Sequence, residues 1–205
     1  MGLKVYNNIE KTRNGKILIQ LKCVQLPSSV VTYHSTFNEE AKYPTACGLA
    51  ILPIKTKTQG PAPKAETEAD DVIDEALAQF RANIFFKNYE VRGPADKVII
   101  YLTVYIQKCL EVIAKNPVEA EAKKALMALM GEAVPSPSLP GFFMGSLALK
   151  GKGAAEEEKF RQYCKQLKEE CGARLFRILF NPEYGTMDLK FWLAFSKRKF
   201  LKLSF

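Results

Sequence analysis

The most apolar part of the chain is the stretch 95–115. Residues 98–106 read Val-Ile-Ile-Tyr-Leu-Thr-Val-Tyr-Ile, with no charge and many β-branched side chains. Periodicity alone would also fit a buried strand, but the apolar pattern continues to Ile113 before Asn116-Pro117 ends it, and that length favours a helix. A helix that is apolar on every side is buried on every side. The pattern therefore predicts a central helix that the other segments surround.

Four further segments have apolar residues at helical spacing. The first is expected to begin at Thr67 as N-cap, to carry acidic residues in its first turns and to end near Tyr89. The other three are expected over about 118–130, 154–180 and 188–201. Gly172 lies inside one of them, where glycine costs about 1 kcal/mol relative to alanine, and is the candidate position for a kink or break. These patterns predict an all-α fold, a compact bundle of about five helices with one central buried helix, plus an N-terminal extension.

Two segments between the predicted helices are rich in proline. Residues 43–65 contain the apolar run Leu49–Ile54, which could lie in a groove of the core, and then Gly60-Pro-Ala-Pro63, which forces an extended link. Residues 131–153 contain the second group of prolines and glycines and are expected to form a linker.

Residues 1–31 differ from the rest of the chain. The run from Gly15 to Leu26 has the composition of a strand, with alternate residues from Ile17 to Cys23 on one face, but no partner strand is evident. We therefore expect residues 1–31 to be an N-terminal extension of uncertain order and residues 32–205 to be a single helical domain.

Cysteine and histidine usage limits the chemistry. The five cysteines are odd in number and form no CxxC pair, which favours reduced thiols over a disulfide scaffold. Cys164 and Cys171 would be about 10.5 Å apart on one helix, beyond disulfide reach, and are expected to be core thiols. The single histidine, His34, lies in a polar stretch and is expected to be an ordinary surface or capping residue.

No pattern of a catalytic, cofactor or metal site is complete. The stretch 145–153 is one residue too long for a GxxxxGK phosphate loop, and Gly153 stands where Ser or Thr should be. The acids 156–158 are expected to form a solvated first helical turn. No catalytic, cofactor-binding or metal-ligating residue can be named, so we expect a protein that is not an enzyme and needs no cofactor.

The chain also lacks the pattern of a membrane span or a signal peptide. Its longest uncharged run, 133–149, contains three prolines that rule out a continuous helix. The formal net charge of +8 comes from the two ends, since residues 32–185 hold as many acidic as basic side chains. Basic ends are typical of proteins that contact acidic partners, although they also fit solvated, solubilising tails.

Two short runs are candidates for partner contacts. In Phe85-Phe-Lys-Asn-Tyr-Glu90 two adjacent aromatics cannot both face one core stripe, so part of this run lies either at a partner surface or under the chain's own wrapping. The basic run Lys197-Arg-Lys199 follows an aromatic segment, and its three side chains cannot all point inward. The partner-binding candidates are Phe85, Phe86, Lys87, Tyr89, Lys197, Arg198 and Lys199.

From about Thr32 to Phe205 the chain resembles the family of actin-related protein 2/3 complex subunit 3. The resemblance rests chiefly on Ala82–Glu90 with Gly60–Pro63 before it, and it extends to Phe191-Trp192, where the family usually has paired tryptophans. It implies an all-helical structural subunit of the assembly that nucleates branched actin filaments. It also implies contacts with actin-related protein 3, the other subunits and the actin filament in the cytoplasm and cytoskeleton, with nucleotide held by other subunits.

The alternative is a free module whose basic tail binds nucleic acid or a membrane surface. Such a module should carry a broad basic face or a basic amphipathic stripe. The neutrality of residues 32–185 argues against a broad nucleic-acid surface.

We predict that deleting residues 1–31 leaves the fold and complex assembly intact, because the resembled family has no counterpart of this segment. The melting temperature should stay within a few degrees of that of the full chain, and the truncated chain should still co-purify with its partners. An insoluble or unassembled truncated chain would show that the segment packs into the structure.

Overall fold

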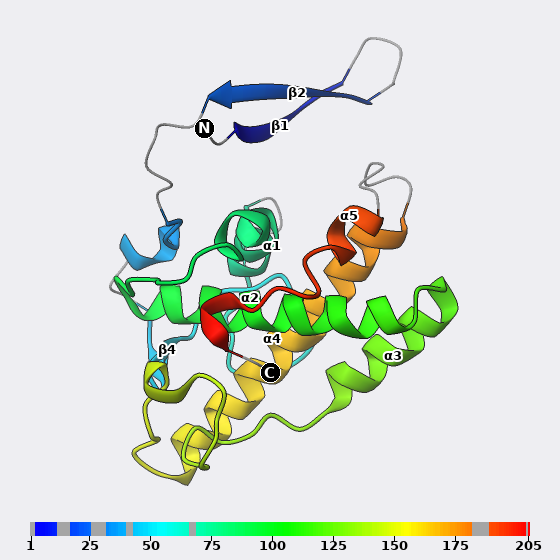
Figure 1. Ribbon diagram of the computed structural model, residues 1–205. Coiled ribbons are helices and arrows are strands. Elements are labelled where there is room, and N and C mark those ends of the chain that lie inside the picture. The colour runs from blue at the N-terminus through cyan, green and yellow to red at the C-terminus, as the bar shows by residue number, and fades with distance from the viewer. Residues whose placement is uncertain are drawn as a thin grey trace. The chain divides into compact units, whose positions relative to one another are not determined.

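A computed structural model describes residues 3–11, 17–25, 32–39, 43–65, 69–181, 189–203 and 205. They divide into two compact units, Met1–Thr32 and Tyr33–Phe205. Among its described residues the larger unit has five α-helices: α1 (Val72–Asn83), α2 (Pro94–Lys115), α3 (Glu119–Gly131), α4 (Ala154–Phe180) and α5 (Leu189–Leu193) (Figure 1). The prediction of an all-α bundle with about five helices is confirmed.

Helix α2 is the centre of this unit. All four other helices pack on it, together with the short strand β4 (Leu49–Ala50). Every residue from Val98 to Ile106 is buried. Thr103 is the only residue of this run with an aliphatic hydroxyl, and it donates a hydrogen bond to the carbonyl oxygen of Ile99 at 2.7 Å. In Figure 1, α2 crosses the middle of the unit, with α4 behind it and the C-terminal segment in front. The predicted central helix is confirmed.

Helix α1 is shorter than predicted at its C-terminal end. It begins at Val72, where Asp71 accepts hydrogen bonds from the backbone N–H groups of Ile73 and Asp74, and Asp74 accepts from the N–H of Asp71. The expected N-cap, Thr67, lies outside the described residues, and the predicted start of the helix is wrong because Asp71 is the N-cap. The helix ends at Asn83, not near Tyr89, because the N–H of Phe86 turns back to the Asn83 carbonyl.

The predicted helix over 188–201 is wrong in its length. Helix α5 ends at Leu193, and a 3-10 turn, Phe200–Lys202, follows after further turns. Trp192, Phe195 and Phe200 are all buried. At about 100° per residue a continuous helix would point Phe200 about 140° away from Phe195, so the helix must break for both rings to reach the core. The break places Leu201 and Lys202 at positive φ.

The predicted bounds of the helices over about 118–130 and 154–180 agree closely with α3 and α4. Helix α4 continues through Gly172, so the candidate break is not realised. A Cβ atom at Gly172 would lie only 2.8 Å from the sulfur of Met130. A larger residue at this position would require the Met130 side chain of α3 to move.

The proline-rich segment 43–65 lies against the core as predicted. Leu49, Ala50, Ile51, Leu52 and Ile54 are all buried, and β4 pairs with β3 (Thr45–Ala46). Further on, the buried amide of Gln166 on α4 donates to the Thr58 carbonyl at 2.8 Å and accepts from the Ala62 N–H at 3.0 Å. A Cβ atom at Gly60 would collide with this amide, which explains a glycine in the Gly-Pro-Ala-Pro run.

The smaller unit is a hairpin of β1 (Leu3–Lys11) and β2 (Ile17–Gln25), paired antiparallel with Leu3 opposite Gln25 and Lys11 opposite Ile17. The expectation that the strand-like run has no partner is therefore wrong. The partner is Leu3–Lys11, whose alternation of Leu3, Val5 and Ile9 is interrupted by Asn7 and so gives a weak signal.

A buried ion pair ties α1 and α4 to the proline-rich segment. The guanidinium of Arg174 on α4 makes two hydrogen bonds to the Asp71 carboxylate, at 2.6 and 2.8 Å, and others to Asp74 and to the Lys55 carbonyl. Burial raises the pKa of Asp71, but the hydrogen bonds and charge of Arg174 and the N–H of Lys55 outweigh it and hold that pKa below its usual value.

We predict that Val104→Asp abolishes folding, because Val104 is 1% exposed and faces packed neighbours on every side. An unpaired buried carboxylate costs several kcal/mol, against a total stability of about 5–15 kcal/mol. Met127→Asp, which adds the same carboxylate to a residue of α3 that is 60% exposed, should fold normally. A cooperatively melting Val104→Asp chain would contradict the central position of α2.

We predict that Arg174→Met lowers the free energy of unfolding at pH 7 by about 3–5 kcal/mol, because Asp71 would be left as an uncompensated buried charge. Since the folded pKa of Asp71 is depressed, its contribution is present above the ordinary value of about 3.9 and is lost as the pH falls through the lower folded pKa. The difference between wild type and variant in urea titrations should therefore shrink below about pH 4. A pH-independent difference would mean that the ion pair is not its source.

Candidate functional site

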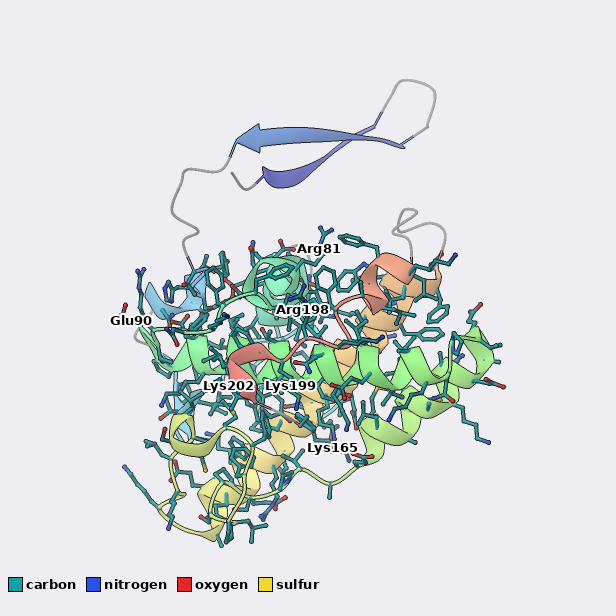
Figure 2. The ribbon with its side chains drawn as sticks, viewed as in Figure 1. Arg81, Glu90, Lys165, Arg198, Lys199 and Lys202 are labelled. Atoms are coloured by element: carbon teal, nitrogen blue, oxygen red, sulfur yellow. The ribbon has the colours of Figure 1, made fainter. Side chains whose placement is uncertain are left out.

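The two candidate runs meet at one surface. Phe85 follows α1 and is 56% exposed, and the guanidinium carbon of Arg198, beyond α5, lies 5.2 Å from the centre of its ring. Figure 2 shows Arg198 on the C-terminal segment, with Arg81 of α1 on the same side of the unit. The sequence analysis named Phe85 and Arg198 as candidates but did not indicate that they touch.

A buried ring joins Phe85 to a second exposed aromatic. The ring of Phe195 makes edge-to-face contacts with Phe85 at 5.8 Å and with Phe191 at 5.4 Å, and Phe191 is 47% exposed. Arg81 lies over the Phe191 ring at 5.6 Å. We call Arg81, Phe85, Phe191 and Arg198, with Phe195 beneath them, the arginine–aromatic surface.

Arg81 and Phe191 were not among the predicted site residues. Their signal in the sequence is weak: Arg81 is four residues before Phe85, a spacing that would place the two on one face only if the helix continued. Phe191 entered the sequence analysis only as the neighbour of Trp192, where the resembled family usually has paired tryptophans. The structure buries its neighbour Trp192, which stacks on Phe80 at 5.8 Å, and leaves Phe191 outside.

The other residues of the Phe85–Glu90 run divide between core and solvent. Phe86 and Tyr89 are half-buried and pack against the core, whereas Lys87 is exposed. The Tyr89 hydroxyl donates to the Tyr33 carbonyl at 2.7 Å, and burial raises the pKa of this phenol. Phe86 and Tyr89 therefore anchor the run from behind, while Phe85 and Lys87 face outward.

The basic run after α5 is exposed throughout. Lys197, Arg198 and Lys199 all have exposed side chains, between the buried residues Ser196 and Phe200. The expectation that the three side chains cannot all point inward is confirmed.

The expectation for His34 is wrong, because this residue is neither a surface nor a capping residue. Its Nδ1 donates to the fully buried Asp96 carboxylate at 2.8 Å, and its side chain is only 12% exposed. Asp96 also accepts from the Ser35 N–H, from Asn38 and from the Arg92 N–H. The missed signal is long-range, since His34 and Asp96 are 62 positions apart.

A second buried carboxylate holds the same segment. Glu75 of α1 accepts hydrogen bonds from the hydroxyls of Tyr33, Ser35 and Thr36 and from the Thr36 N–H. With the Asp96 cluster it fixes the residues after Thr32 to α1 and α2. These polar groups satisfy one another and hold this segment against the two helices.

Two of the three acidic residues at the start of α4 accept more hydrogen bonds from other segments than expected. Glu156 accepts from the N–H groups of Cys47 and Lys152, which hold its pKa below the usual value. Glu157 accepts from the hydroxyls of Ser136 and Ser138. These two acids therefore fasten loops to the helix rather than only stabilising its first turn, and only Glu158 remains exposed.

The described residues offer little for catalysis. No group of three His, Cys, Asp or Glu among them could hold a metal ion. Cys47, Cys109, Cys164 and Cys171 are buried free thiols, and burial raises the pKa of Cys109 to about 12. The prediction of core thiols at Cys164 and Cys171 is confirmed. Within the described parts of the chain no helix is long and apolar enough to cross a membrane.

Comparison with known proteins places these features in a family context. Residues 30–205 match the family model described as P21-Arc, ARP2/3 complex ARPC3 (21 kDa) subunit. A protein of Arabidopsis thaliana named actin-related protein 2/3 complex subunit 3 is 40% identical over 173 residues, which are 84% of this chain and 98% of the relative. Proteins of the same name from Dictyostelium discoideum and Schizosaccharomyces pombe are 42% and 37% identical over 83% and 82% of this chain, and over 98% and 96% of their own lengths.

Proposed function

The chain belongs to the P21-Arc family, the ARPC3 (21 kDa) subunits of the ARP2/3 complex, and from that premise we propose that it contributes to the nucleation of branched actin filaments without catalysing a reaction. It is a structural subunit of the complex. Its role is to hold neighbouring subunits in the arrangement from which a daughter filament starts. Its place of action is the cytoplasmic actin cytoskeleton.

The observation that carries this function is the match of one continuous helical unit to the family. The match to the family model begins at residue 30, and the larger compact unit begins at Tyr33. We therefore propose that residues 32–205 are the part that assembles and that residues 1–31 are an extension added to it. The alternative of a free nucleic-acid or membrane module gains no support from the relatives, which are named as subunits of one complex.

A non-catalytic role agrees with the chemistry of the core. The buried carboxylates of Asp71, Glu75 and Asp96 are each engaged by several donors from other segments, so they brace the fold. A braced core supports a rigid docking surface, because the side chains at an interface then lose little freedom on binding.

The proposed partners are actin-related protein 3, the other subunits of the complex and the actin filament. The outward-facing candidates are Phe85, Lys87, Lys197, Arg198 and Lys199. Actin is acidic, so a cluster of exposed cations suits a surface that faces actin or an actin-related protein. Phe86 and Tyr89 would act indirectly, by holding Phe85 in place.

The experiment that tests this function is affinity purification of the tagged full chain from the cytosol of its own cells at moderate salt. A stoichiometric set of partners that includes actin-related proteins is expected. Recovery of the chain alone, or with nucleic acid, would contradict the function.

We predict that replacing Lys197 and Lys199 by Glu weakens co-purification and branching while the melting temperature falls only slightly, since both side chains are exposed. The effect should lie mainly in the association rate and should depend on salt, because charges at the rim of an interface chiefly steer encounter. The matched control is the exposed pair Lys123 and Lys124 of α3, also changed to Glu. Equal assembly of the two variants across salt concentrations would mean that the run 197–199 is only a solvated part of the segment after α5.

A further inference from the structure

We propose that the arginine–aromatic surface is a docking site for an acidic segment of a partner protein, one that presents carboxylates on both sides of an apolar side chain. The inference rests on the proposed function and names the chemistry of one contact within it. It brings in Arg81 and Phe191, to which neither the sequence nor the family match assigns a role.

The surface has a defined order of side chains. Arg198 lies on Phe85, Phe85 touches Phe195, Phe195 touches Phe191, and Arg81 lies on Phe191. Two exposed rings therefore form an apolar floor, and one guanidinium stands at each end of it. These side chains come from the C-terminal end of α1, from the residue run after it, from α5 and from the segment after α5.

The two guanidinium groups lie near aromatic rings and form no ion pair with an acid among the described residues. Each guanidinium carbon lies within cation–π distance of a ring centre. A guanidinium can bind a carboxylate in a bidentate manner through its N–H groups. None of the ion pairs between described residues includes Arg81 or Arg198, whereas Arg161 pairs with Glu158 and Arg174 with Asp71. The missing anions are expected to come from another molecule.

The apolar floor explains why the ligand should also carry an apolar group. Phe85 and Phe191 are among the few large apolar side chains of the described residues that are strongly exposed. Aromatic and arginine side chains are the residues that most often dominate binding energy at protein interfaces, where they surround a desolvated centre. An apolar side chain between Phe85 and Phe191 would exclude water from the adjoining carboxylate–guanidinium pairs and so strengthen them.

A protein segment fits this surface better than an anionic membrane. Recognition of anionic lipid typically uses clusters of about four to eight Lys or Arg side chains, mostly acting as point charges. Lys197 and Lys199 flank Arg198, so the number of charges alone does not separate the two ligands. The two cations that lie on the rings are arginines separated by aromatic side chains, a spacing that suits discrete carboxylates along a chain. Lipid binding is therefore kept as a competing outcome of the test.

Trp192 provides a direct reporter. It is the only tryptophan of the chain, and it lies beneath the surface, with Arg81 at 6.0 Å from its ring. The full chain would be titrated with a short synthetic peptide of Asp and Glu around a central Leu, while tryptophan fluorescence is followed at two salt concentrations. Control ligands would be the same peptide with Asn and Gln in place of the acids, and phosphatidylcholine vesicles containing anionic phosphatidylserine.

Saturable binding of the acidic peptide, weakened by salt and absent for the amide peptide, is expected. The double variant Arg81→Gln/Arg198→Gln and the single variant Phe85→Ala should each weaken it at least about tenfold. The control double variant Lys123→Gln/Lys124→Gln removes as many charges from the exposed side of α3 and should bind like wild type. Melting curves of all variants would confirm that they are folded.

Three outcomes would overturn the inference: equal affinity for the two peptides, equal binding by the arginine and the lysine double variants, or binding of anionic vesicles but not of the acidic peptide. The same variants should then be tested in co-purification from cytosol. If wild type assembles and the arginine double variant assembles equally well, the docking site is wrong and the proposed function stands. If wild type itself recovers no partners, the proposed function fails.

Discussion

The constraint on which the structure depends is that the middle of α2 has no side that faces water. With Val98–Ile106 buried on all sides, the chain must supply a cover in every direction. Helices α1, α3 and α4 and the run Leu49–Ile54 supply most of it. The C-terminal segment closes the side that Figure 1 shows in front: Phe205 lies against the rings of Tyr101 and Tyr105, at 5.8 and 5.4 Å. Residues 194–203 do not form a continuous helix because they have to cover this side of α2.

The arginine–aromatic surface arises where two parts of that cover meet. The end of α1 and the segment around α5 join through a buried cluster of Phe80, Trp192 and Phe195. The rings of Phe85 and Phe191 lie at the outer edge of this cluster, because the core beneath them is already filled. Each carries an arginine rather than a covering apolar residue. The packed aromatic cluster is rigid. The long arginine side chains above it can adjust the positions of their charged groups.

The sequence predicted what depends on local pattern and missed what depends on distant partners. Helices α2 and α4 were found because their apolar spacing and their Pro or Asn-Pro ends are local signals. The end of α1 was misplaced because Tyr89 is held by a carbonyl 56 positions away, and the role of His34 was missed for the same reason. Adjacent Phe85 and Phe86 look alike in sequence, and only packing decides that Phe85 is outside. Arg81 could not be found before its ring partner was known.

The most direct test of the account is hydrogen exchange of backbone amides, compared between the isolated chain and the chain within the assembled complex. Amides of α2 around Val98–Ile106 should be the slowest to exchange in both states, since they open only with the whole unit. On assembly, amides of residues 84–90 and 191–199 should slow, while those on the exposed side of α3 remain unchanged. Slowing on α3 with no change at 84–90 and 191–199 would contradict the account, because it would place the partner on another face.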